Sequence, residues 1–168
     1  LEDYVLDFNV SSAEADVDLS NNSGQRTYSV DFNTYARDDN TIAGGLGVTA
    51  AGNIMQGQEF DVAVATTMDN VDISFGGGVA GDTVNARVYQ MVGGAVGAVV
   101  AQTADVILAG PGTGYTTFTF GTTVNLAPGT YMIGIYHGSA AAASNIGLDY
   151  SNDIFSPGKA WLQVNGGA

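Results

Sequence analysis

Hydrophobic side chains in this chain alternate with polar ones or form short runs of β-branched and aromatic residues, and no segment repeats them at the spacing of a helix. Clusters of Gly, Asn and Asp interrupt these segments at intervals of roughly 8–12 residues, which is typical of sandwiches and barrels built from short strands. The pattern predicts an all-β, antiparallel β-sandwich with an additional N-terminal strand or arm. The predicted strands are Tyr4–Val10, Thr27–Tyr35, Glu59–Thr66, Val71–Phe75, Thr83–Met91, Ala98–Gln102, Asp105–Leu108, Tyr115–Phe120, Thr130–Tyr136, Ile146–Tyr150 and Ala160–Val164.

Two of these segments alternate clearly enough to assign their faces. In the segment from Thr130, Tyr131, Ile133 and Ile135 alternate with Met132 and Tyr136, so large side chains lie on both faces. A strand with apolar bulk on both faces is usually central and covered on both sides, which places this strand in the middle of the core. The segment from Thr83 alternates in the same way, with Val84, Ala86, Val88 and Gln90 on one face and Asn85, Arg87, Tyr89 and Met91 on the other.

The N-terminal segment resembles a later one. Tyr4–Asn9 and Tyr28–Asn33 share Tyr, Asp, Phe and Asn at matching positions. One interpretation is two similar strands, one at an edge and one inside. The other is that the first copy takes the place of the second in a neighbouring molecule, because a donated strand builds fibres through backbone hydrogen bonds. We therefore divide the chain into an N-terminal strand or arm, 1–26, and a single sandwich domain, 27–168. The predicted assembly residues are Tyr4, Val5, Leu6, Phe8 and Val10.

The composition restricts the partners. Four Lys and Arg residues stand against 17 Asp and Glu, a formal net charge of −13. An acidic chain without a basic patch does not bind nucleic acid, and no apolar run is long enough for a membrane span. The chain has no Cys, which excludes disulfides and thiolate metal sites. A surface of Thr, Ser, Asn, Gly and Asp with a single Lys is common outside cells, so we expect an extracellular or cell-surface location.

Several segments in order resemble a known family. The chain contains Val71–Phe75, Thr83–Tyr89, Thr116–Phe120 and then Val124–Tyr131, which reads VNLAPGTY. This order resembles the jelly-roll β-sandwich modules of cell-surface and type IX-secreted proteins of the Bacteroidetes, over about residues 58–164. The resemblance implies a jelly-roll-like fold and an extracellular setting. It carries no catalytic residues across, because such modules are mostly non-enzymatic.

Clusters of Asp and Asn are candidate calcium sites, because hard cations prefer carboxylate and amide oxygens. The candidate ligands are Asp16, Asp18, Asn21, Asp38, Asp39, Asp149 and Asp153. None of the clusters has the complete EF-hand spacing. The alternative is that these side chains form turns by bonding their own backbone.

Four other side chains suggest chemistry. Trp161, the only Trp, and Tyr150 are candidate sugar-stacking residues, although a position in the core or at a sheet edge would also explain Trp161. His137 is the only His and lacks a nucleophile motif, so we expect it at the end of a core strand with its ring half exposed. Lys159, the only Lys, is a weak candidate for an intramolecular isopeptide bond.

The predicted function is therefore that of a non-catalytic extracellular structural or adhesive surface protein. In its most specific form, the hypothesis makes the chain a subunit of a fibre or surface layer that assembles by strand pairing. The expected partners are copies of the same chain or other cell-surface proteins. The alternative is a carbohydrate-binding module that binds glycans and holds a structural calcium ion. Neither hypothesis includes catalytic residues.

Overall fold

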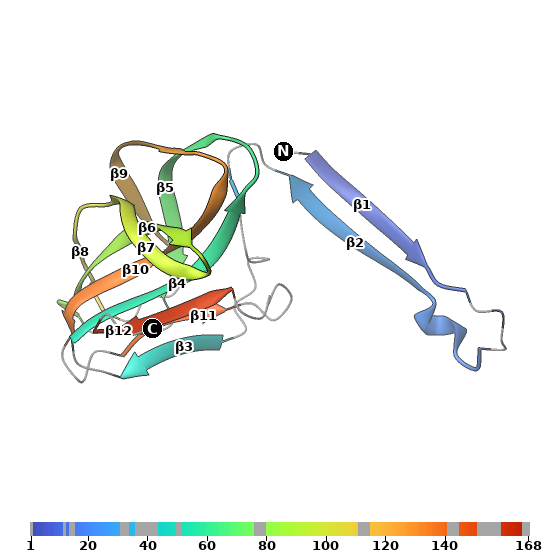
Figure 1. Cartoon of the computed structure of the whole chain (residues 1–168). Coiled ribbons are helices and arrows are strands. Elements are labelled where there is room, and N and C mark those ends of the chain that lie inside the picture. The colour runs from blue at the N-terminus through green and yellow to red at the C-terminus, as the bar shows by residue number, and fades with distance from the viewer. Residues whose placement is uncertain are drawn as a thin grey trace. The chain divides into compact units, whose positions relative to one another are not determined.

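The structure is a computed structural model (Figure 1). It describes residues 2–11, 13, 16–30, 34–35, 44–49, 52–75, 80–110, 115–140, 145–150 and 159–165. The strands are β1 (Glu2–Asn9), β2 (Ser23–Val30), β3 (Gly44–Thr49), β4 (Gly52–Val62), β5 (Thr66–Ser74), β6 (Thr83–Val92), β7 (Ala95–Gln102), β8 (Val106–Ile107), β9 (Tyr115–Leu126), β10 (Gly129–Ala140), β11 (Asn145–Tyr150) and β12 (Ala160–Val164). The strand pairs are all antiparallel, so the predicted all-β, antiparallel fold class is confirmed.

The chain divides into two units, 1–37 and 38–168. The first unit is a hairpin in which β1 pairs with β2 along its whole length, and the 3-10 helix η1 (Leu19–Asn21) lies in the connection. Tyr4 pairs with Tyr28, so the two similar segments begin as neighbours within one hairpin. The boundary expected between residues 26 and 27 falls inside β2. The compact unit that contains this hairpin comprises residues 1–37.

The second unit is built on a six-stranded sheet with the order β12-β4-β10-β6-β7, in which β8 also pairs with β6 (Figure 1). The strand predicted to be central is β10, and it lies between β4 and β6. That prediction is confirmed. Two further pairs, β5 with β9 and β3 with β11, complete the described strands of this unit.

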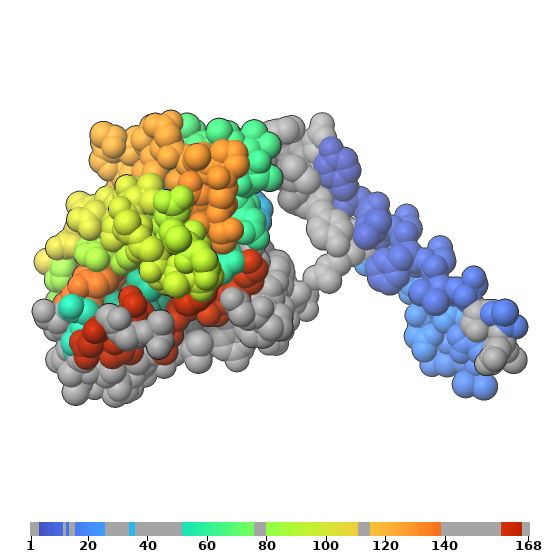
Figure 2. All heavy atoms as spheres, viewed as in Figure 1, coloured from blue at the N-terminus to red at the C-terminus, as the bar shows by residue number. Residues whose placement is uncertain are grey.

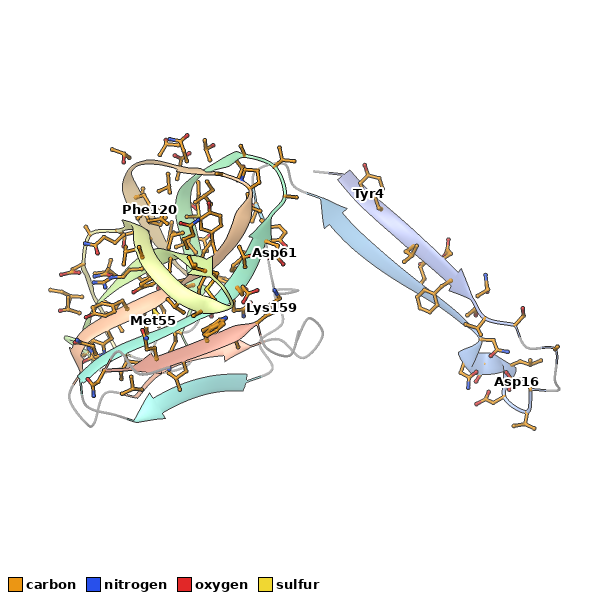
Figure 3. The ribbon with its side chains drawn as sticks, in the orientation of Figure 1. Tyr4, Asp16, Met55, Asp61, Phe120 and Lys159 are labelled. Carbon is orange, nitrogen blue, oxygen red and sulfur yellow. The ribbon has the colours of Figure 1, made fainter. Side chains whose placement is uncertain are left out.

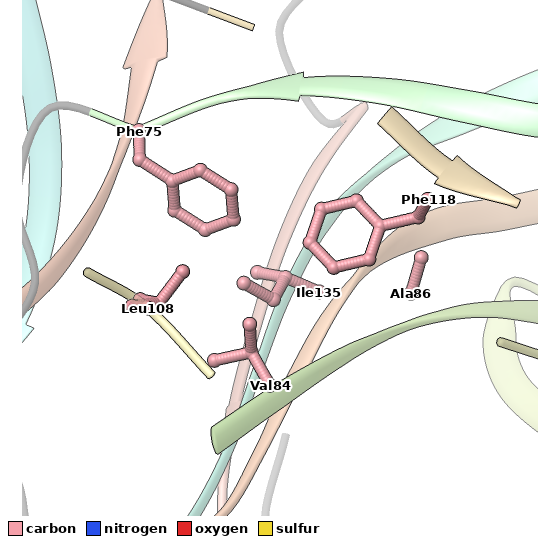
Figure 4. Close-up of a cluster of buried hydrophobic side chains, with 6 residues drawn as sticks. All are labelled: Phe75, Val84, Ala86, Leu108, Phe118 and Ile135. Carbon is pink, nitrogen blue, oxygen red and sulfur yellow. The ribbon is translucent and has the colours of Figure 1, made fainter. Parts of the chain in front are cut away.

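One face of the six-stranded sheet packs on β5 and β9. In Figure 4, Val84 and Ile135 from the six-stranded sheet meet Phe75 and Phe118 in one cluster, and the two rings are tilted by 54° with centroids 6.0 Å apart. A second cluster continues this layer, with Val88, Phe120, Val124, Leu126 and Tyr131. The two sheets therefore form the layered core of a sandwich, and burial of these side chains from water is the main force that holds the layers together.

The opposite face of the same sheet carries a different set of side chains. Met55, Tyr89 and Met132 are buried there, and Tyr136 and Trp161 pack against them. The predicted alternation of β6 and β10 is confirmed, because Val88 and Tyr131 belong to one face while Tyr89 and Met132 belong to the other. The central strand is thus buried on both sides.

A pair of glycines brings β4 and β10 unusually close together. Gly57 pairs with Gly134 in the register of these strands. A Cβ atom added at Gly134 would overlap the carbonyl oxygen of Gln56 and the backbone of Gly57. Neither backbone atom can move aside as a side chain could, so the close approach requires glycine here.

We predict that Gly134→Ala lowers the free energy of unfolding by about 1–3 kcal/mol, the range typical of overpacking in a core. The matched control is Gly121→Ala in β9, where an added Cβ would meet nothing within 4 Å. The control should change stability by less than about 0.5 kcal/mol. Urea unfolding of the two variants measures both values, and equal stability would contradict the close approach.

Candidate functional site

A row of apolar side chains follows one face of the N-terminal hairpin. The even-numbered residues of β1 share a face because side chains alternate along a strand. Tyr4, Leu6 and Phe8 on this face are 53%, 51% and 50% exposed, and Val10, which follows β1 and donates its backbone N–H to Asn22, continues the row at 65%. The ring of Phe8 lies over Gly24, whose missing side chain leaves room for it. We call these four residues the apolar row.

The other face of β1 is mostly polar. Asp7 accepts a hydrogen bond of 2.8 Å from the side-chain amide of Gln25 on β2. Val5, at 54% exposed, is the single large apolar residue among the described side chains on this face of β1. The predicted assembly residues therefore divide between two faces, with Val5 on the polar one and Tyr4, Leu6, Phe8 and Val10 forming the row.

The connection between β1 and β2 contains three of the candidate calcium ligands. Asp16 accepts a hydrogen bond of 3.0 Å from the backbone N–H of Asp18, and Asp18 accepts from the backbone N–H of Ser20 at 3.0 Å (Figure 3 labels Asp16). The Asp18 backbone, and then Asn22, hold the pKa of Asp16 below its usual value. The hydroxyl and backbone of Ser20 do the same for the pKa of Asp18. These carboxylates therefore form turns at the start of η1.

The other candidate ligands lie at several places along the chain, and Asn21 is the third one in this connection. Asn21 lies in η1, and Asp149 lies in β11, where the structure describes the backbone alone. Asp38, Asp39 and Asp153 lie outside the described residues. Among the described residues, no group of three or more His, Asp or Glu side chains could hold a metal ion.

The edge strand β7 contains no charged residue. It is the last strand of its sheet and reads AVGAVVAQ. Within the described part of the chain, β6 is its sole strand partner. Val99 and Val100 are 44% and 43% exposed, and the register of β7 against β6 shifts between Val99 and Ala101. In Figure 2 the yellow-green and yellow spheres of residues 83–102, which include β7, lie at the front surface. An exposed apolar edge of this kind is a template for pairing with another strand.

Lys159 lies in a cluster of side chains at the other edge of the sheet. Its ammonium group contacts the carboxylate of Glu59 and lies 3.4 Å from Asp61 Oδ2 (Figure 3 labels Lys159 and Asp61). The hydrogen bond to Glu59 is the largest cause that raises the pKa of Lys159. A raised pKa keeps the amine protonated, so the geometry fits an ion pair and gives no support to an isopeptide bond.

The structure describes the side chain of one of the two predicted sugar-stacking residues, Trp161. Trp161 is half-buried on the edge strand β12, and its ring packs against the cluster of Met55, Tyr89 and Met132. Its indole N–H donates to Glu59 Oε2 at 3.3 Å. The structure thus places Trp161 at a sheet edge, partly within the core. The side chain of Tyr150 lies outside the described residues.

His137 is buried at the end of β10, with 4% of its surface exposed. The expectation of a half-exposed ring is therefore wrong. His137 pairs with Ile54 and Val84 on the neighbouring strands, so the sheet encloses it on both sides. Its Nε2 atom lies 3.8 Å from Asp82 Oδ1, and its Nδ1 atom has no hydrogen-bond partner among the described residues.

Sequence reasoning missed a polar pocket of about 270 Å³ on the face of the sheet that carries Tyr89 and Met132. It is lined by Thr83, Asn85, Arg87, Gln102, Asp105, Tyr136 and Gly138. The signal was present in the predicted alternation, which put Asn85 and Arg87 on one face. That alternation alone could not show that Tyr136 and Asp105 come to the same place, because they are distant in the sequence.

Comparison with protein families, characterised proteins and solved structures gives no significant match to this chain. In the described part of the chain, no helix has the length and apolar character needed to cross a membrane.

The raised pKa of Lys159 predicts a pH dependence. A group whose pKa is higher in the folded state stabilises the fold below its unfolded pKa, and the contribution disappears as the pH rises through the folded pKa. We therefore compare the free energy of unfolding of the parent chain with that of Lys159→Met. The difference should be constant between neutral pH and pH 10.5, the ordinary pKa of Lys, and should shrink above that pH.

Urea unfolding of both proteins across this range measures the difference. Tyrosine ionisation affects both proteins alike and cancels in the comparison. A difference that stays constant or grows above pH 10.5 would contradict the ion pair.

Proposed function

We propose that this protein is a non-catalytic structural or adhesive protein of the cell exterior, and that it assembles with copies of itself by strand pairing through the β1–β2 hairpin. The observation that carries the proposal is that residues 1–37 form a unit of their own, with two described strands and a half-exposed apolar row. The extracellular setting rests on the acidic, Lys-poor composition and on the resemblance to jelly-roll modules of surface proteins.

A hairpin of two strands needs a partner to be stable. Isolated two-stranded hairpins are marginal in water, and they gain stability from a third strand or from packing of an apolar face. Burying the remaining half of Leu6, Phe8 and Val10 would contribute about 1 kcal/mol for each side chain. Among the described strands β1 pairs with β2 alone, and addition of a strand to its other edge would satisfy the outward backbone groups. One neighbouring molecule can provide both.

The edge strand β7 of a second copy is the partner that we propose for β1. Both strands are eight residues long, so their lengths match. β1 carries three acidic residues, Glu2, Asp3 and Asp7, in a chain with a net charge of −13. Most surfaces of a second copy would therefore repel it, whereas β7 carries no charge. Pairing of β1 with β7 of another copy joins two different surfaces, so the contact is heterologous. Such contacts extend into a fibre when the rotation that relates successive copies does not close a ring.

We predict that Leu6→Ser weakens assembly and that Val5→Ser does not. The two residues are neighbours on β1 with similar exposure, and neither change alters charge, but only Leu6 belongs to the apolar row. Loss of its burial should raise the concentration at half-assembly by about tenfold, the equivalent of 1.4 kcal/mol. Sedimentation velocity over a concentration series measures this midpoint. Equal midpoints for the two variants would contradict packing through the row.

We also predict that Val99→Lys blocks assembly without lowering the stability of the monomer, because lysine on an edge strand opposes pairing with a further strand. The matched control is Val64→Lys, which adds the same charge at a residue that is exposed outside the sheet. Sedimentation velocity and thermal unfolding measure the two properties. Assembly of the Val99 variant at the parent concentration would show that β7 is not the acceptor.

A further inference from the structure

The side chain of Arg87 is held in a fixed orientation inside the polar pocket. Its guanidinium carbon lies 3.4 Å from the centre of the Tyr136 ring, in a cation–π stack. Its Nε–H donates to Asn85 Oδ1 at 2.9 Å. Asn85 is fixed in turn, because its amide donates to Asp105 Oδ1 at 2.7 Å. The stack and the hydrogen bond together orient the remaining N–H groups of the guanidinium before any ligand arrives.

Arg87 has no ion-pair partner among the described residues, although acidic residues greatly outnumber basic ones in the chain. Residues 38–168 contain one other cation, Lys159, and that side chain contacts two carboxylates. Asp105 lies in the same pocket, but Asn85 stands between its carboxylate and the guanidinium. A half-buried guanidinium that pairs with none of the described carboxylates is suited to bind an anion that enters from solvent.

The other groups of the pocket suit hydroxyls rather than a second charge. Thr83 supplies a hydroxyl, Gln102 an amide and Asp105 a carboxylate with one oxygen beyond its bond to Asn85. These groups donate and accept in fixed directions, as recognition of a sugar hydroxyl requires. The volume of about 270 Å³ is slightly below the range for drug-sized ligands, so it suits one sugar residue.

From this arrangement we infer that the pocket binds a uronate, a sugar residue whose carboxylate pairs with Arg87 while its hydroxyls contact Asp105 and Gln102. The chain's net charge of −13 repels every anion at long range, so a single carboxylate needs additional contacts to stay bound, and Asp105 repels a second anionic group at short range. The ligand must therefore combine one carboxylate with several hydroxyls. The site is separate from the Trp161 position that the sequence suggested for sugar stacking, and it does not depend on assembly.

The test is a titration of the full-length, 15N-labelled chain with glucuronate, glucose and acetate, followed by NMR at a protein concentration below that of assembly. Glucuronate should shift the side-chain signals of Asn85, Arg87 and Gln102 with a dissociation constant on the order of 1 mM. Glucose lacks the carboxylate and acetate lacks the hydroxyls, so each should bind at least about tenfold more weakly. Equal binding of acetate and glucuronate would indicate a site for simple anions. Equal binding of glucose and glucuronate would show that Arg87 does not contribute to the affinity. Either result overturns the inference.

Variants test the same site independently. Arg87→Gln should weaken glucuronate binding by at least about tenfold, and Arg87→Lys, which keeps the charge but loses the planar fork, by a smaller factor. The control is Lys159→Gln, which changes the net charge equally and should leave the affinity within about twofold. If Arg87→Gln does not fold, Gln102→Ala replaces it, because Gln102 is exposed and its loss should still weaken binding severalfold. Unchanged affinity in the folded pocket variants would overturn the inference.

Discussion

The arrangement of the second unit depends on one constraint, the burial of β10 on both of its faces. Its odd-numbered residues, such as Tyr131 and Ile135, form the layer shared with β5 and β9. Its even-numbered residues, such as Met132 and Tyr136, lie on the opposite face. Because one strand serves both faces, its position fixes the neighbours β4 and β6, and through them the Lys159 cluster at one edge and the Arg87 pocket towards the other.

The scarcity of positive charge gives these two places their different character. Lys159 is neutralised by Glu59 and Asp61, so it links β12 to β4 and offers nothing to a ligand. Arg87 is stacked on an aromatic ring and held by an amide instead of a carboxylate. The same sheet thus uses one cation to hold an edge strand in place and presents the other to solvent. The proposed uronate site follows from that contrast.

Sequence reasoning predicted the parts of the fold that depend on local period-two alternation. The faces of β6 and β10 were predicted correctly, because strand geometry fixes which residues share a face. Elements rich in glycine were harder. β3, which reads GGLGVT, was missed, and β9 was expected to end at Phe120, although it continues past Gly121 to Leu126. The sequence pattern treats clusters containing Gly as breaks between strands, but Gly121 lies within the extended strand β9.

Interactions between distant residues could not be predicted from local pattern. Glu59 and Lys159 are 100 residues apart, and the pocket joins residues of β6, β7 and β10 with Asp105, which follows β7. The pairing of β1 with β2 was also missed, although the similar segments at Tyr4 and Tyr28 were recognised. Similarity indicated that both segments form strands, but it contains no information about which strand each one pairs with.

The central claim, that β1 of one molecule completes the β7 edge of another, is tested most directly by backbone hydrogen exchange on the full-length chain over a concentration series. The account predicts that amides of β1 and β7 become protected together as the protein assembles, while those of β10 are protected at every concentration because that strand is buried. Exchange in β1 and β7 that does not change with concentration, in a protein that remains monomeric, would contradict it.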